Sequence, residues 1–197
     1  MTSGICLQQP CTSAALPSPA VRATAIAMTL WCLGFAGVNV ALALTGHLSR
    51  GDLAGYAGGL EVENWLAVAL KVLGAAVALL AVSAPRQFPS VGAVTVMVWG
   101  AFATLGVYAA GAVLEAVAML LGLIGGADRI DALSVGYVLF FIAGAAGFGV
   151  LGVSWSRRHA QRRSRAALGL VAAPLVLGTL LVGVPALLTA VGVMPRT

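Results

Sequence analysis

The stretch Val91–Gly125, with the sequence VGAVTVMVWGAFATLGVYAAGAVLEAVAMLLGLIG, decides the fold of this chain. It contains thirty-five residues, no proline and a single charged group, Glu115. At a rise of about 1.5 Å per residue it makes a helix of roughly 52 Å, whereas the hydrocarbon core of a bilayer is about 30 Å thick. The stretch therefore predicts a membrane-spanning helix with length to spare.

The composition of the whole chain lies outside the range of soluble globular proteins. Of its 197 residues, 60% are hydrophobic and 9% are charged, and the mean hydropathy is +1.02. A net charge of +5 would indicate a nucleic-acid partner in a soluble protein, but five arginines lie within residues 157–165. We interpret these arginines as topology signals of a membrane protein and expect no nucleic-acid partner.

Four further apolar segments are long enough to cross a bilayer, which takes about 20 residues in a helix. We therefore predict an all-α polytopic membrane protein, a bundle of five transmembrane helices, in which residues 21–197 form a single domain. Residues 1–20 carry three prolines and no charged side chain, and we expect them to be a disordered cytoplasmic tail. The four additional segments are 23–45, 65–84, 132–155 and 166–193.

The distribution of arginines predicts the orientation of the bundle. Arg22, Arg86 and the 157–165 loop fall on one side of a five-helix bundle, while the loops 46–64 and 126–131 fall on the other. The positive-inside rule then places the N-terminus in the cytoplasm and the C-terminus on the extracytoplasmic side. Ten arginines against one lysine, among many Ala, Gly, Val and Leu residues, are typical of a high-GC bacterium. We expect a multi-pass protein of the bacterial inner membrane.

Two opposite charges lie within the apolar segments, where a charge needs a partner or a role. Counted from Trp65 and from Gly125, Lys71 lies about 9 Å and Glu115 about 15 Å below the outer boundary, so we expect them to meet between the second and third segments. Three interpretations stay open. The two form an ion pair that fixes helix register, or they line a polar pocket that binds a substrate or lipid headgroup, or Lys71 snorkels to the interface while Glu115 lies higher.

The third segment also carries a polar stripe. Thr104, Tyr108, Gly111 and Glu115 follow one another at spacings of four, three and four residues, which places them on one helical face. The stripe predicts either the wall of a pocket or a surface that hydrogen-bonds to neighbouring helices around a small residue. Asn39 is a further buried amide, of a kind typical of interhelical contacts. The candidate ligand-binding residues are Lys71, Glu115, Tyr108, Thr104 and Asn39.

No metal and no cofactor are expected. His47, Asp52, Glu61 and Glu63 of the outer loop carry ligand atoms, but their spacing matches no metal-binding motif, and a solvated acidic loop explains them. The chain contains no GxSxG, HExxH, Walker A or dinucleotide-binding glycine motif, which argues against a Ser-His or metal-dependent hydrolase. The arginine loop can attract anionic lipid headgroups, although fixing topology is sufficient to explain it.

A series of features runs from about Ala67 to Arg158, over nearly half the chain. They are Leu70-Lys71 before an Ala/Leu-rich run, a turn with Arg86 and Pro89, Trp99, Tyr108, Leu121-Gly122, and the end from Trp155 to Arg158. Their order resembles a family of small, uncharacterised integral-membrane proteins common in actinobacteria. The resemblance implies the membrane architecture, and it implies no chemistry because the family has no known function.

These observations predict a small integral-membrane protein that binds or passes a small apolar or lipid-like molecule, or that is a membrane subunit of a larger assembly. The expected partners are the lipid bilayer, a lipid or isoprenoid-like ligand, and a membrane-protein partner or further copies of the chain. The alternative is an integral-membrane enzyme acting on a lipid or isoprenoid substrate. In that case Glu115 is the general acid, its proton affinity raised by burial, and Tyr108 orients the substrate.

Overall fold

Five α-helices make up the fold. The computed structural model describes residues 16–47, 57–83, 89–125, 130–160 and 163–190, and these residues contain helices but no strand. All five helices are long and apolar enough to cross a membrane, which confirms the predicted all-α, five-helix architecture. The helices are α1 (Pro19–Leu44), α2 (Ala57–Leu80), α3 (Val91–Leu120), α4 (Ala132–Arg158) and α5 (Arg163–Ala190).

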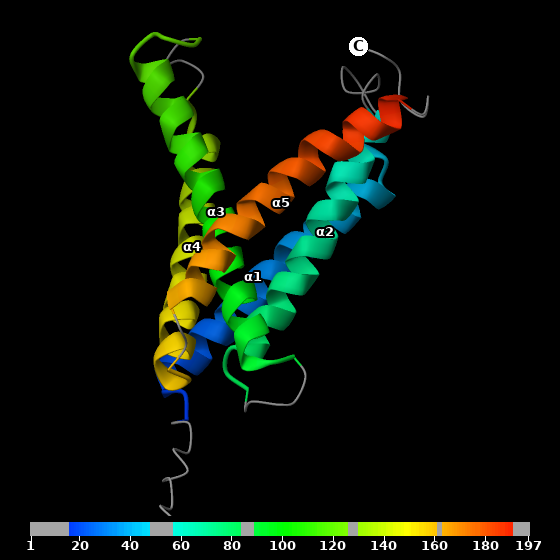
Figure 1. Ribbon diagram of the computed structural model, residues 1–197. Helices are drawn as coiled ribbons and strands as arrows, with labels where there is room; N and C mark the ends of the chain where they lie inside the picture. Colours follow the sequence, from blue (N-terminus) through cyan, green and yellow to red (C-terminus); the bar gives the residue numbers. More distant parts are fainter. Residues whose placement is uncertain (1–15, 48–56, 84–88, 126–129, 161–162, 191–197) are drawn as a thin grey trace, which may run out of the picture.

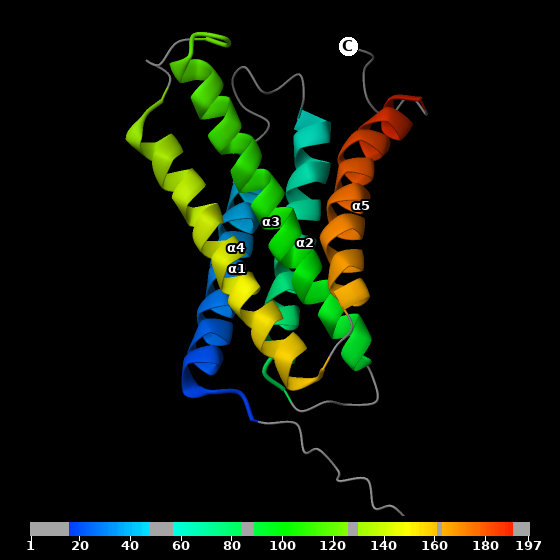
Figure 2. The same ribbon diagram turned by 60° about the vertical axis from the view of Figure 1, so that its left-hand side comes forward.

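The helices alternate in direction along the bundle. Helix α1 begins at the end where α2 finishes and α3 starts, and α5 finishes at the opposite end (Figures 1 and 2). This alternation brings Arg22, Arg157, Arg158 and Arg163 to one end of the bundle, because each lies in the first or last turn of its helix. The predicted gathering of arginines at one end is therefore present. Arg86 lies outside the described residues.

Several helix boundaries differ from those expected. Helix α1 begins at Pro19, where the Ser18 hydroxyl accepts a hydrogen bond from a backbone N–H of the first turn, a common way to start a helix. The predicted tail is thus shorter at this end, and its residues 1–15 lie outside the described part. Helix α3 ends at Leu120 rather than at Gly125, and Gly122 follows with a φ of 70°, a turn conformation that favours glycine.

Helix α2 begins at Ala57, eight residues before the expected Trp65. Glu61 and Glu63 are therefore helical residues and do not belong to a solvated loop, which corrects the expectation for the acidic loop. Asn64, in the same part of α2, is buried, and its amide donates a 2.9 Å hydrogen bond to the backbone carbonyl of Asn39 in α1. This contact draws the start of α2 onto α1 and accounts for a helix that continues beyond the apolar sequence.

The helices pack in two groups, and α4 belongs to both. Helix α1 packs against α2 and α4, whereas α3 packs against α4 and α5, and the contact between α2 and α3 is small. Figure 2 shows α3 and α4 crossing in front of α1 and α2. The largest side chains with almost no exposed surface are Trp155, Phe148 and Leu151 of α4 and Val98 of α3. Helix α4 is therefore the central element of the core.

Two tryptophans join α3 to α4 at the arginine end. The Trp155 Nε1–H donates to Thr95 Oγ1 at 3.2 Å, and the Trp99 Nε1–H donates to Ser156 Oγ at 3.0 Å. Thr95 is fully buried, and its own hydroxyl donates to the Val91 carbonyl at 2.9 Å. Because the indole N–H groups of both Trp99 and Trp155 have partners, these bonds fix the register of α4 on α3.

Helix α5 crosses α3 at very short range (Figure 1). A Cβ placed on Gly169 of α5 would lie 2.5 Å from the Val96 carbonyl oxygen and 3.1 Å from the Gly100 nitrogen of α3. Those neighbours are backbone atoms that cannot turn away, so the crossing requires a residue without a side chain. Close approach of backbones at small residues is a usual way for helices to associate in membranes.

Candidate functional site

Lys71, the single lysine of the chain, lies near the middle of α2 with its ammonium group held among aromatic rings. The Nζ atom is 4.1 Å from the ring centroid of Trp31, 4.6 Å from that of Phe35 and 4.9 Å from that of Phe141. Trp31 and Phe35 are one turn apart on α1, and Phe141 belongs to α4. All three distances are within the range of about 6 Å over which a cation is attracted to an aromatic face.

The rings around Lys71 form a larger aromatic cluster, made of Trp31, Phe35, Tyr108, Tyr137, Phe140 and Phe141. The Trp31 and Phe140 rings are stacked with centroids 4.6 Å apart, and the Tyr108 and Tyr137 centroids lie 4.4 Å and 4.8 Å from that of Phe141. Trp31 can approach α4 because Gly144 faces it, where a Cβ would lie only 2.8 Å from the indole. The cluster thus joins α1, α3 and α4 at the level of Lys71.

The predicted ion pair between Lys71 and Glu115 is not formed. Glu115 is exposed on α3, and the Lys71 ammonium makes neither an ion pair nor a hydrogen bond with any of the residues that the structure describes. Two features explain the difference. Lys71 lies at the middle of a helix that starts earlier than expected, while Glu115 lies near the end of α3, and α2 and α3 share only a small contact.

A groove of about 550 Å³ opens beside Lys71, and residues from all five helices line it. The lining is predominantly apolar, and Leu73 of α2 and Val176 of α5 are more than half exposed, so the groove opens onto the outer surface of the bundle. We call it the Lys71 groove. Its defining residues are Phe35, Lys71, Thr104, Tyr108, Tyr137 and Val176.

The few polar side chains of the Lys71 groove include hydrogen-bond donors. Among the described helical threonines, Thr24, Thr29, Thr95 and Thr179 each donate their hydroxyl to the carbonyl one turn back, at 2.8–3.0 Å. The Thr104 hydroxyl makes no such bond, nor any other within the described ranges, although its residue lines the groove. Together with the Lys71 ammonium and the phenol of Tyr108, it offers donors to an oxygen atom of a bound molecule.

The structure brings together three of the five predicted ligand-binding residues. Lys71, Thr104 and Tyr108 line the groove, whereas Glu115 does not. Asn39 does not line it either. Its side-chain amide donates to the Phe35 carbonyl at 2.8 Å, and its own carbonyl receives the Asn64 bond between α1 and α2. The polar stripe on α3 is therefore divided between the groove and the outer surface.

The contact of aromatic residues with Lys71 was not predicted from the sequence. Trp31 and Phe35 are separated by one helical turn, which places both on one face of α1, and Phe140 and Phe141 are adjacent in α4. That spacing was the available signal, but it does not say which helix the face contacts. Of the carboxylates considered for a cation site, Glu61 and Glu63 lie in α2, and Asp52 lies outside the described residues.

Comparison of the chain with protein-family models, with curated proteins and with solved structures found no match. The resemblance to small actinobacterial membrane proteins stays a prediction, and the function is argued from the geometry alone.

Proposed function

We propose that this protein binds an elongated, largely apolar, lipid-like molecule in the Lys71 groove, with an oxygen-bearing head group at Lys71. The observation that carries the proposal is an ammonium group that lines a largely apolar groove and forms no ion pair with a described side chain, Glu63 of the same lining included. A charge at this depth in a membrane needs a partner or a role. A carboxylate, phosphate or carbonyl oxygen of the ligand would supply that partner, while the apolar walls would take its chain.

The aromatic cluster supports this proposal by positioning the ammonium group. The rings of Trp31, Phe35 and Phe141 contact the Lys71 ammonium. Thr104 and Tyr108 line the same groove as Lys71. Attraction to aromatic faces is worth about 0.5–2 kcal/mol, which is less than a buried ion pair can supply, so the ammonium remains free to gain from an oxygen ligand.

The proposal includes the orientation of the protein. The arginines that gather at one end of the bundle support a cytoplasmic N-terminus in a bacterial inner membrane, by the positive-inside rule. The Lys71 groove would then hold its ligand within the bilayer. The alternative of acid catalysis gains no support, because Glu115 is exposed on α3 and lies outside the groove that contains Tyr108.

The test uses the purified protein in mild detergent and three probes built on the same eighteen-carbon cis-9 chain: oleate, methyl oleate and cis-9-octadecene. We expect oleate to raise the midpoint of thermal unfolding, methyl oleate to raise it less, and octadecene to leave it nearly unchanged. A ligand at a hundredfold excess over its Kd stabilises the folded state by about 2.7 kcal/mol. The variant Lys71→Met should lose most of the response to oleate.

A matched pair of tryptophan substitutions tests the location. Ala67 lines the Lys71 groove, whereas Ala69 is exposed elsewhere on the same helix. Ala67→Trp should fill the groove and abolish stabilisation by oleate, and Ala69→Trp should retain it. Equal responses of these two variants, or an unchanged response of Lys71→Met, would overturn the proposal.

A further inference from the structure

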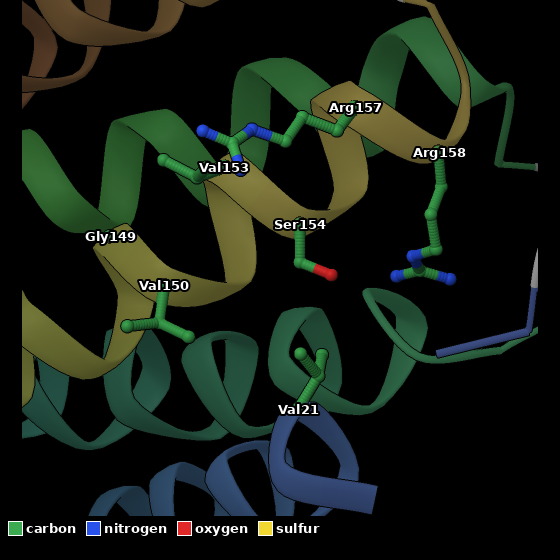
Figure 3. Close-up of a pocket in the computed structure, with 7 residues that line it drawn as sticks. All are labelled: Val21, Gly149, Val150, Val153, Ser154, Arg157 and Arg158. Atoms are coloured by element: carbon green, nitrogen blue, oxygen red, sulfur yellow. The ribbon is translucent and has the colours of Figure 1, made fainter. Parts of the chain in front are cut away.

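A second cleft lies on the outside of the bundle at the arginine end, between the start of α1 and the end of α4 (Figure 3). Its volume is about 570 Å³, and it shares no lining residue with the Lys71 groove. We call it the arginine cleft. Its lining residues are Val21 of α1, and Gly149, Val150, Val153, Ser154, Arg157 and Arg158 of α4.

The arginine cleft is amphipathic along its length. Val150 and Val153 line its part toward the middle of α4, whereas Arg157 and Arg158 line its part at the helix end. From Val150 to Arg157 is about 10 Å along the helix axis, which is two turns. The lining therefore changes from apolar to basic toward the helix end, in the order in which a lipid changes from acyl chain to headgroup.

The polar part of the arginine cleft contains hydrogen-bond donors that have no acceptor among the described residues. Within the described part of the chain the Ser154 hydroxyl and the Arg157 guanidinium have no hydrogen-bond or ion-pair partner, and the Arg158 Nε–H is buried without one. In Figure 3 the Ser154 oxygen and the Arg158 guanidinium lie on the same side of α4, facing Val21, while Arg157 extends beside Val153. An oxyanion with several oxygens would offer acceptors to the Ser154 hydroxyl and the Arg158 guanidinium, and the exposed Arg157 side chain would turn from Val153 to reach it.

Arg158 is held in position by contacts of its own. Its Nη2 donates to the Ala81 carbonyl at the end of α2, and its guanidinium lies 5.6 Å from the ring centroid of Trp155. These contacts restrict the side chain before any ligand arrives, which reduces the entropy lost on binding. The Ala81 contact engages one nitrogen of the guanidinium, so other N–H groups remain for a ligand.

Among the residues that the structure describes, no side-chain carboxylate lies at the arginine end. The six acidic residues of the chain are at positions 52, 61, 63, 115, 128 and 131. Those that the structure describes lie in the first turns of α2, in the last turns of α3 and directly before α4, all toward the opposite end of the bundle. The positive charge of the arginine cleft is therefore available to an external anion.

We propose that the arginine cleft binds one anionic phospholipid of the cytoplasmic leaflet, with the phosphate at Ser154, Arg157 and Arg158 and an acyl chain along Val150 and Val153. Attraction between a basic residue and an anionic membrane surface amounts to about 1 kcal/mol for each Lys or Arg, roughly a fivefold change in affinity. The proposal rests on the proposed orientation but does not depend on a ligand at Lys71.

The test counts phospholipids that remain bound to the detergent-purified protein by native mass spectrometry, with phosphatidylglycerol and phosphatidylcholine of identical acyl chains. We expect the first phosphatidylglycerol to bind at least fivefold more tightly than phosphatidylcholine. Arg157→Gln should remove most of this preference. Arg163→Gln removes an exposed arginine at the same end that does not line the cleft, and it should retain the preference.

Two valines of α4 give a second matched pair that leaves the charge unchanged. Val150, which lines the cleft, is 49% exposed, and Val135, which does not, is 47% exposed. Val150→Trp should fill the cleft and displace the phosphatidylglycerol, whereas Val135→Trp should not. Equal losses for Arg157→Gln and Arg163→Gln would show diffuse surface charge instead of a site, and lipid retained by Val150→Trp would also overturn the proposal.

Two further measurements identify the source of the phosphate and separate this site from the Lys71 groove. Millimolar glycerol 3-phosphate should not displace the lipid, and displacement would mean that the cleft binds a water-soluble phosphate instead. Lys71→Met should leave phosphatidylglycerol binding unchanged. A loss in that variant would mean that the two sites are one and would contradict the assignment to the arginine cleft.

Discussion

The ammonium group of Lys71 lies 4.1 Å from the centre of the Trp31 ring, so the one lysine of the chain is held by an indole of α1. A lysine at the centre of a membrane helix costs about 2.5–3.5 kcal/mol on insertion scales, and a cation–π contact returns about 0.5–2 kcal/mol. Without a ligand, the cation–π contact therefore does not offset the cost of placing the lysine in the membrane. We therefore expect Lys71 to have a role that a neutral side chain could not perform.

Replacing Lys71 tests this balance. Because the ammonium has no counter-charge, Lys71→Met should increase the free energy of unfolding of the ligand-free protein by about 1 kcal/mol, the difference between the desolvation cost and the cation–π gain. Unfolding of the purified protein in mixed micelles measures the change. A decrease of several kcal/mol, as when one partner of a buried ion pair is removed, would contradict the geometry at Lys71.

The missing contact between Lys71 and Glu115 is tested by a double-mutant cycle. The effects of Lys71→Met and Glu115→Gln on the free energy of unfolding should add within about 0.5 kcal/mol, since the two side chains do not meet. A coupling energy above about 1 kcal/mol would indicate that they interact after all. The cycle needs only the two single variants and their combination.

The crossing of α3 and α5 predicts a sharp difference between two glycines of α5. Gly169→Ala should lower the free energy of unfolding by about 1–3 kcal/mol, because the new methyl group meets backbone atoms of Val96 and Gly100. A Cβ on Gly178 would meet nothing within 4 Å, so Gly178→Ala should be neutral or stabilising by up to about 1 kcal/mol. Thermal unfolding of the two variants measures the difference, and equal midpoints would contradict the crossing.

The hydrogen bond of the buried Trp155 indole should contribute to the free energy of unfolding. Trp155→Phe should lower the free energy of unfolding by about 1–3 kcal/mol, because the variant loses the bond to Thr95 and leaves space in the core. Trp65, which is 44% exposed on α2, provides the control, and Trp65→Phe should change the free energy by less than about 0.5 kcal/mol. Chemical unfolding followed by circular dichroism compares them, and similar values would contradict the buried position of Trp155.

Asp131 precedes α4, and its carboxylate should make the stability of the first turn of that helix depend on pH. Hydrogen bonds from the Ser134 side chain and from its backbone N–H, at 2.7 Å, hold the pKa of the Asp131 carboxyl below its ordinary value of 3.8. A depressed pKa means that the carboxylate stabilises the helix start at pH values above 3.8, and that this contribution is lost as the pH falls through the lower, folded-state pKa.

An NMR titration of the Ser134 amide in micelles measures this effect. Its hydrogen-exchange protection should persist as the pH falls to about 4 and decline below that value. Asp131→Asn, which keeps a side-chain oxygen at the cap, should make the amide insensitive to acid in this range. Ser134→Ala should shift the decline to higher pH, because it removes the side-chain hydrogen bond. A decline centred above pH 3.8 in the unaltered protein would contradict the cap geometry.

The fold was predictable because apolar length and arginine position are properties of single segments. The long stretch after Val91 defines a helix, and the arginines after Trp155 define the end of the bundle at which basic residues gather, without reference to any neighbour. The start of α2 was not predictable in the same way. It depends on the contact of Asn64 with the Asn39 carbonyl, a tertiary interaction that extends the helix through Glu61 and Glu63.

The candidate site was predictable only in part, for a related reason. The polar positions Lys71, Thr104 and Tyr108 stand out within apolar sequence, and all three line the groove. The partner of Lys71 could not be read from depth alone, because depth along a helix does not give rotation about its axis. Trp31 and Phe141 reach Lys71 through the packing of α1 between α2 and α4, which no segment encodes by itself.

The sideways opening of the Lys71 groove, where Leu73 and Val176 are exposed, determines how any occupant must arrive. A strongly apolar compound dissolves in the surrounding membrane first, so its mole fraction there, and not its aqueous concentration, governs how often the groove is filled. The acyl tails of ordinary lipids compete for the same walls. Any selectivity of the groove must therefore come from the head group of the bound molecule, which reaches Lys71. The apolar walls accept the acyl tail of any neighbouring lipid equally well.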